Sequence, residues 1–156
     1  MVKHLIESYL MGPKTLRQAV AGMIREQLVS RPVPGKWSTL EVVCHIVDSD
    51  EAWIHRMKRV IAEERPLHIG YDERCFAAAL GYQERDLEEE LSLLELSRRQ
   101  MAHILRILPA EAWNRVGVHN EYGLLTLQQH VQTMVDHIPH HVKFIGEKRR
   151  ALGLAS

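Results

Sequence analysis

Histidine is the residue type that most suggests chemistry in this chain, because ten of its 156 residues are histidine. Imidazole is the commonest metal ligand in proteins and exchanges protons near neutral pH. In a helix, with about 100° per residue, His130, His137 and His141 fall within an arc of about 40°. Met134 shares this stripe, so we expect it to face inward, where imidazole nitrogens need partners. A bound metal ion is one partner that meets this need.

The spacing of the histidines predicts a three-ligand site. His137 and His141 are four residues apart, which lets two imidazoles of one helix bind the same ion. This pair is a weak signal alone, so a third ligand from another element is needed. His45 is the best candidate because its helical face carries small residues that leave room for an ion. Those residues are Val42, Ser49 and Ala52.

A site with three imidazoles would leave one coordination position open for water or a substrate atom, whereas structural zinc sites usually fill all four. Zinc, nickel and ferrous iron would each accept these ligands. The competing interpretation is a bundle whose histidines are incidental. A di-iron centre needs Glu-x-x-His pairs on two helices, whereas the pairs here, Glu41/His45 and Glu51/His55, are four apart on one helix.

Other polar residues allow more than one interpretation. Asp48 would either orient a ligand imidazole or bound water, or remain a solvated helix charge. His130 either lines the site or lies outside it. We assign the remaining histidines to surface, peripheral or otherwise satisfied positions: His4, His55, His68, His103, His119 and His140.

The elements that must position these residues are predicted to be helices, because apolar residues recur with helical period along nearly the whole chain. Ser38 with Glu41 and Thr126 with Gln129 fit capping boxes at two helix starts. We expect an irregular segment over 66–82 with a short helix near 73–79. The long helices are expected at about 13–28, after a turn or two within 2–10, and at about 38–65, 83–108 and 126–152.

Four long amphipathic helices predict an all-α four-helix bundle in one domain spanning residues 1–156. The two middle loops are long for antiparallel hairpins. One of them can therefore be a crossover connection between parallel helices, and loop length alone does not say which.

Composition argues against several classes of partner. The chain has 20 basic residues (Lys plus Arg) and 20 acidic residues (Asp plus Glu), so its formal net charge is zero. It therefore lacks the excess of positive charge that is typical of nucleic-acid-binding proteins. No apolar run approaches the roughly 20 residues needed to cross a bilayer, and Glu7 comes too early for a signal sequence. We therefore expect a cytoplasmic protein with neither nucleic acid nor membrane as its partner. The two cysteines, Cys44 and Cys75, do not form a disulfide framework.

Several segments in this order resemble the DinB/YfiT-like superfamily. Residues 35–48 (GKWSTLEVVCHIVD) resemble its second-helix signature, and Tyr71-Asp72-Glu73 also fits. Residues 117–123, 126–127 and the His137-x-x-x-His141 pair resemble its C-terminal half. Together these features span roughly residues 35–145.

The resemblance implies a four-helix bundle, often a homodimer, with a metal held by one histidine of the second helix and two of the last. Those positions here are His45, His137 and His141. Characterised relatives include transferases and isomerases that use bacillithiol or mycothiol, and others have no known activity. The resemblance therefore implies a fold and a metal more firmly than a reaction.

We expect a metal-dependent enzyme in which the ion lowers the pKa of a bound water or low-molecular-weight thiol. The activity would be that of a hydrolase or a thiol S-transferase acting on a small-molecule substrate, with His130 and Asp48 as candidate proton carriers. The alternatives are a non-catalytic stress protein that binds a metal or small ligand, and a bundle-type interaction module.

Overall fold

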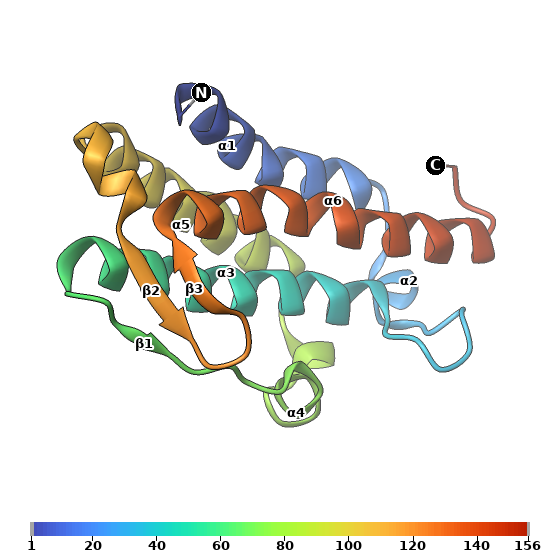
Figure 1. Ribbon diagram of the computed structural model, residues 1–156. Coiled ribbons are helices and arrows are strands. Elements are labelled where there is room, and N and C mark those ends of the chain that lie inside the picture. Colours follow the sequence, from blue (N-terminus) through green and yellow to red (C-terminus); the bar gives the residue numbers. More distant parts are fainter. Residues whose placement is uncertain (1, 156) are drawn as a thin grey trace.

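The fold is a bundle of four long helices with a small sheet at one end (Figure 1). The computed structural model describes residues 2–155. The long helices are α1 (Val2–Ala19), α3 (Thr39–Ala62), α5 (Leu87–Arg106) and α6 (Leu127–Ala151). The shorter elements are α2 (Arg25–Val29), α4 (Glu73–Ala79), η1 (Tyr82–Glu84) and η2 (Ala110–Asn114), with strands β1 (Leu67–His68), β2 (Val116–His119) and β3 (Gly123–Thr126).

The four long helices form a ring in which α1 and α3 each pack between α5 and α6. Helices α1 and α5 are antiparallel, since Glu7 pairs with Arg106 and Arg17 pairs with Glu88. Helices α3 and α6 are also antiparallel, and this is the pair that carries the predicted ligand histidines. The all-α four-helix bundle predicted from the sequence is confirmed.

Helices α3 and α5 run in the same direction. Asp50 of α3 contacts Arg98 of α5, and Lys58, further along α3, contacts Gln100. Residues 63–86 must therefore return along the bundle, and they carry β1, α4 and η1 on the way (Figure 1). The long connection between α3 and α5 is thus the crossover between parallel helices.

Capping boxes start both helices of the predicted site. The Ser38 hydroxyl accepts from the backbone N–H of Glu41 (3.1 Å), whose carboxylate accepts from the N–H of Ser38 (2.7 Å). Thr126 and Gln129 exchange the same two hydrogen bonds at 3.1 and 2.8 Å. Both predicted boxes are confirmed, and they fix where α3 and α6 begin.

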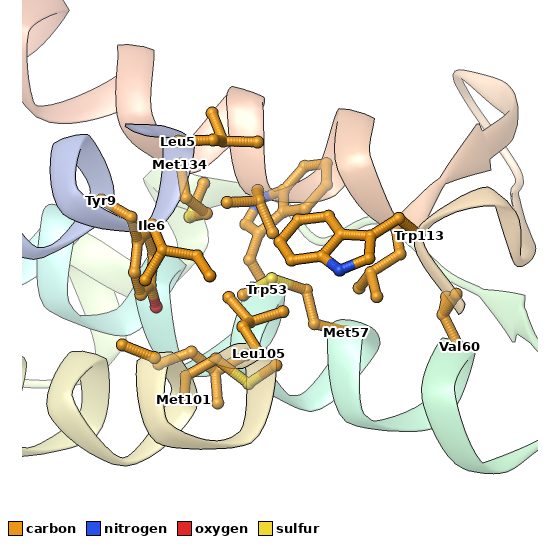
Figure 2. Close-up of a cluster of buried hydrophobic side chains, with 14 residues drawn as sticks. Leu5, Ile6, Tyr9, Trp53, Met57, Val60, Met101, Leu105, Trp113 and Met134 are labelled. Carbon is orange, nitrogen blue, oxygen red and sulfur yellow. The ribbon is translucent and has the colours of Figure 1, made fainter. Parts of the chain in front are cut away.

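The largest hydrophobic cluster joins all four long helices near the end that carries the sheet (Figure 2). Tyr9 and Met134 are fully buried there, with Met57 and Met101. Trp53 of α3 and Trp113 of η2 fill the same region (Figure 2). This core sets the distance between α3 and α6 and therefore between their side chains.

The first helix differs from the expectation of a helix from 13 to 28. Helix α1 runs without interruption from Val2 to Ala19 through Pro13. A proline inside a helix leaves the carbonyl four residues earlier without its usual donor. Here that carbonyl belongs to Tyr9, and it accepts from Nη1 of the buried Arg98 at 2.8 Å. The arginine supplies the missing donor, so the helix continues.

Two segments expected to be irregular contain strands. Strand β1 pairs in parallel with β2, and β2 pairs antiparallel with β3, in the order β1-β2-β3. The register places His68 opposite His119, and His119 opposite Gly123. The short helix expected near 73–79 is confirmed as α4. No helix within residues 2–155 combines the length and apolar character needed to cross a bilayer.

Candidate metal centre

The three histidines singled out by spacing converge at one point between α3 and α6. His45 is on α3, two turns after the Ser38 cap, and its side chain is buried. His137 and His141 project from α6 toward it. The Nε2 atom of His141 lies 3.1 Å from Nε2 of His45 and 3.1 Å from Nε2 of His137. Each histidine offers a nitrogen within 4.8 Å of the other two.

These distances fit a shared ion. Two nitrogens that bind one ion at about 2.1 Å lie roughly 3.0–3.4 Å apart at ordinary coordination angles. A neutral imidazole carries one proton, so His141 Nε2 cannot donate to both neighbours at once. A cation would satisfy all three lone pairs together. The donor set is therefore suited to a divalent metal.

The environment keeps the three rings neutral. Burial, followed by the neighbouring His141 and His45, lowers the pKa of His137 to about 3. Burial, followed by His45 and His140, lowers the pKa of His141 to about 3. Burial also lowers the pKa of His45, against the opposing effect of Glu73 and Asp48. Neutral imidazoles present the lone pairs that metal binding requires.

Packing orients the rings more than hydrogen bonds do. The buried Nδ1 atoms of His45 and His137 have no hydrogen-bond partner within residues 2–155. Metal-bound histidines usually donate this second N–H to a carboxylate or carbonyl. Here the Trp37 ring lies 5.3 Å from the His45 ring, centroid to centroid, and the His45 and His137 rings are also 5.3 Å apart. The contacts that these two rings make within the described residues are therefore aromatic.

A cavity of about 190 Å³ opens beside the cluster and is partly lined by His45 and His137. Glu73, the first residue of α4, places its carboxylate 3.6 Å from His45 Nε2. Tyr71 and Ser49 line the same cavity, and their hydroxyls share a hydrogen bond of 2.8 Å. The crossover connection thus covers the cluster with polar side chains and still leaves space for a small molecule.

Asp48 is bound by two side chains of the crossover connection. Its carboxylate accepts from the Tyr82 hydroxyl at 2.7 Å and from Arg85 Nη1 at 2.8 Å. It is neither a solvated charge nor a hydrogen-bond partner of a cluster imidazole. The crossover connection brings Tyr82 and Arg85 against this part of α3, which is why Asp48 is not a solvated helix charge.

His130 is buried on α6 but lies outside the three-histidine cluster. Its Nδ1 atom lies 2.8 Å from the carbonyl oxygen of Thr126, and its ring packs against Trp53 and His68 at centroid distances of 5.3 and 5.5 Å. A role for it in the site has no support in these contacts.

The assignment of His68 and His119 to surface or satisfied positions was wrong in part. Each is only 2% exposed, and both nitrogens of His68 lack a hydrogen-bond partner within residues 2–155. The strands that bury them were not predicted. Arg56, which lines the cavity, was also missed. The sequence spacing could have identified Arg56, because it follows His45 by three helical turns and therefore lies on the same helix face.

A family model described as the DinB superfamily matches residues 9–145. YfiT of Bacillus subtilis, named as a candidate metal-dependent hydrolase, is 30% identical over 142 residues, which cover 90% of this chain and 80% of YfiT. A protein of Oceanobacillus iheyensis with the same kind of name is 29% identical over 133 residues, covering 85% of this chain and 77% of that protein.

Solved structures agree with these sequence matches. The YfiT structure has a TM-score of 0.91 to this chain at 28% identity, covering 99% of this chain and 89% of that one, and is described as having an unusual four-helix bundle topology. A DinB-like protein of Bacillus subtilis, YjoA, shares the fold with a TM-score of 0.64 at 16% identity, covering 98% of this chain and 94% of that one. The family match over most of the sequence and the identity to YfiT show that the chain belongs to the DinB superfamily.

Proposed function

We propose that His45, His137 and His141 bind one divalent metal ion and that the chain is a metal-dependent hydrolase of small molecules. The observation that carries the proposal is the convergence of three imidazole nitrogens beside a cavity, with Nε2–Nε2 distances of 3.1 Å. The names of YfiT and its relatives, which describe candidate metal-dependent hydrolases, support the same class of reaction.

The chain's own residues contribute binding and proton transfer. His45, His137 and His141 would hold the ion through neutral imidazoles, and a divalent ion there would supply Lewis-acid chemistry, an acidified water and a polarised substrate oxygen. Glu73 lies at the cavity with its side chain 57% exposed, so it can exchange a proton with solvent. The hydroxyl pair of Ser49 and Tyr71 can donate a hydrogen bond to a substrate oxygen. Zinc, nickel and ferrous iron all suit the ligand set.

Thiol transfer is the second candidate, and a separate depression favours it. A groove of about 360 Å³ borders His141, and Trp37 and Phe144 line it. Its cationic side chains are Lys36, Arg74 and Lys148; they outnumber its two carboxylates, Glu73 and Glu147, and would attract an anionic low-molecular-weight thiol. The cavity and the groove at one cluster would offer space for a thiol and an electrophile together.

Elemental analysis of the untagged chain tests the metal site. We expect about one equivalent of divalent metal, lost in His45→Ala, His137→Ala and His141→Ala. The matched control is His140→Ala, which removes an exposed imidazole adjacent to His141 and should leave the metal content unchanged. Absence of metal after incubation with zinc, nickel, manganese and iron would contradict the proposal, as would equal loss in the control.

Activity assays separate the two reactions. The metal-loaded chain is screened against esters and amides, and against electrophiles with common low-molecular-weight thiols. Hydrolysis that depends on His45 supports the hydrolase, and thiol consumption that depends on His45 supports the transferase. A chain that binds metal and performs neither reaction would be a non-catalytic binding protein.

A further inference from the structure

Arg56 places a buried guanidinium on the wall of the cavity beside the three histidines. The residue is only 7% exposed and lines the cavity with His45 and His137. Its Nη2 donates to the carbonyl oxygen of Ile69 at 2.9 Å, and its guanidinium carbon lies 5.0 Å from the Trp53 ring centroid. Within residues 2–155, no carboxylate lies within 4.0 Å of it.

This lack of an ion-pair partner distinguishes Arg56 from the other deeply buried arginine. Arg98 is fully buried and forms a two-pronged pair with Asp50, at 2.7 Å for each contact. Buried charges are ordinarily paired, because removing a charge from water is costly. Arg56 has a single neutral acceptor and faces open volume. An anion entering the cavity would supply the partner that the chain does not.

His119 provides a second donor on the same wall. The backbone N–H groups of Glu121 and Tyr122 both point to its Nδ1 atom, at 3.1 and 3.4 Å. Nδ1 is therefore the acceptor, so the ring carries its proton on Nε2. The ring lines the cavity and stacks on Trp53 with an interplanar angle of 7°. The strand pairing fixes this ring, and its remaining N–H is free to donate to a ligand.

Aromatic side chains make up much of the rest of the wall. Trp53, Tyr71 and Tyr122 line the cavity, whose volume is about 190 Å³. This size and lining suit a flat molecule of about one ring. The planar fork of an arginine matches the two oxygens of a carboxylate.

Two acidic residues at the cavity affect whether it can bind a negatively charged ligand. Glu73 and Glu121 also line it, and both are exposed. Glu121 forms no ion pair with Arg56, and its carboxylate lies against the Gly70 backbone. Water screens exposed carboxylates far more than a buried guanidinium. The buried charge that a ligand meets inside the cavity is therefore positive.

We propose that this cavity binds the carboxylate of a small, flat organic acid, held by Arg56 and the Nε2–H of His119, with the rest of the molecule directed toward the three histidines. The inference rests on the proposed function in one respect, because it assigns the substrate class of that enzyme. The binding step itself requires only residues of the chain.

Isothermal titration with benzoate and with its neutral counterpart benzamide tests the carboxylate site. The full chain is titrated as purified, and again after metal and chelator have been removed. In both states benzoate should bind more tightly than benzamide. Arg56→Gln should weaken benzoate binding about tenfold or more, the effect of losing a charged hydrogen-bond partner, and should weaken benzamide binding less, because the neutral amide oxygen gains less from the cation. Arg56→Lys, which keeps the charge and is the milder change for folding, should give an intermediate loss.

Two further variants calibrate the result. Lys58→Gln removes the same charge two residues along α3, from a half-buried ammonium that donates to Gln100 and does not line the cavity, and should leave benzoate affinity unchanged. Glu121→Gln should strengthen benzoate binding by removing a nearby negative charge. Equal affinity for benzoate and benzamide, no binding of either, or unchanged affinity in both Arg56 variants would overturn the inference.

The outcome is separable from that of the metal proposal. Benzoate binding that depends on Arg56 in a chain that takes up no metal would keep the carboxylate site and remove the hydrolase. Metal uptake without benzoate binding would keep the metal site and remove the carboxylate site.

Discussion

Arg98 stabilises the centre of the bundle by serving several helices at once. Its guanidinium pairs with Asp50 of α3 and donates to the carbonyl oxygens of Tyr9 in α1 and Met134 in α6. The side chains of Arg98 and Asp50 are 0% and 1% exposed. This network forms one turn of helix from the histidine cluster, so it helps to fix the spacing between α3 and α6.

Removal of the carboxylate from this network should be severely destabilising. Asp50→Ala would leave the Arg98 cation buried and unpaired, and breaking a buried pair in this way costs about 3–5 kcal/mol. Urea denaturation of the metal-free chain measures the loss. The matched control is Glu7→Ala, which breaks the exposed pair with Arg106, whose side chains are 50% and 55% exposed. That pair should contribute about 0–1 kcal/mol, and equal losses in the two variants would refute the assignment.

Single residues differed in how well they could be predicted. Helical spacing placed His137 and His141 on one face, and the small side chains around His45 together with the family resemblance made it the third candidate, but whether the three meet depends on which helices are neighbours. Arg56 was open to the same argument, because it occupies the same face three turns later. His119 was not, because its burial depends on a strand of four residues whose partners lie in distant segments. Such short strands carry almost no periodic signal.

At the scale of elements, helix ends with a local capping motif were predictable. Helix boundaries that depend on a side chain distant in sequence were not. The starts of α3 and α6 were correctly placed because each has a local capping box. The start of α1 was not, because its passage through Pro13 depends on the distant Arg98. The strand order could not be predicted either, because β1 lies between α3 and α5 whereas β2 lies between α5 and α6.

The sheet packs against α3 with very little clearance at Gly117. A Cβ atom built there would lie 2.5 Å from Nε2 of His68 and 3.0 Å from Cγ2 of Val60. Gly117→Ala should therefore force strand β2 away from its neighbours and destabilise the chain by about 1–3 kcal/mol. Because β2 carries His119, binding of benzoate should weaken in the same variant.

Gly146→Ala is the control for this substitution. Its added Cβ would meet only the flexible end of Arg150, at 3.5 Å, within helix α6. Alanine is the better helix former, so this change should stabilise the chain by up to about 1 kcal/mol. Opposite signs in thermal or urea denaturation are expected. If Gly117→Ala left the stability unchanged, the sheet would not be held tightly against α3.

For the molecule as a whole, buried neutral histidines link stability to pH. Burial, followed by the nearby His130 and Arg59, lowers the pKa of His68 to about 4. The pKa values of His137 and His141 are lowered to about 3 by burial and neighbouring cations or histidines. In the unfolded chain these groups titrate near pH 6.5. Between about pH 6.5 and 4 the unfolded state therefore binds more protons than the folded state, and acid favours unfolding.

The free energy of unfolding of the metal-free chain should thus fall as pH drops through about 6.5 toward 4. Each histidine that is neutral when folded and protonated when unfolded contributes a slope of up to about 1.4 kcal/mol per pH unit. His68→Gln removes one such group without touching the metal ligands, so its slope between pH 6 and 4.5 should be shallower by up to that amount. His103→Gln removes an exposed imidazole from α5 and should leave the slope as it is. Urea denaturation at a series of pH values measures both. An unchanged slope in His68→Gln would mean that this ring is protonated in the folded chain, and the buried contact between the sheet and α6 would then have to hold a charge.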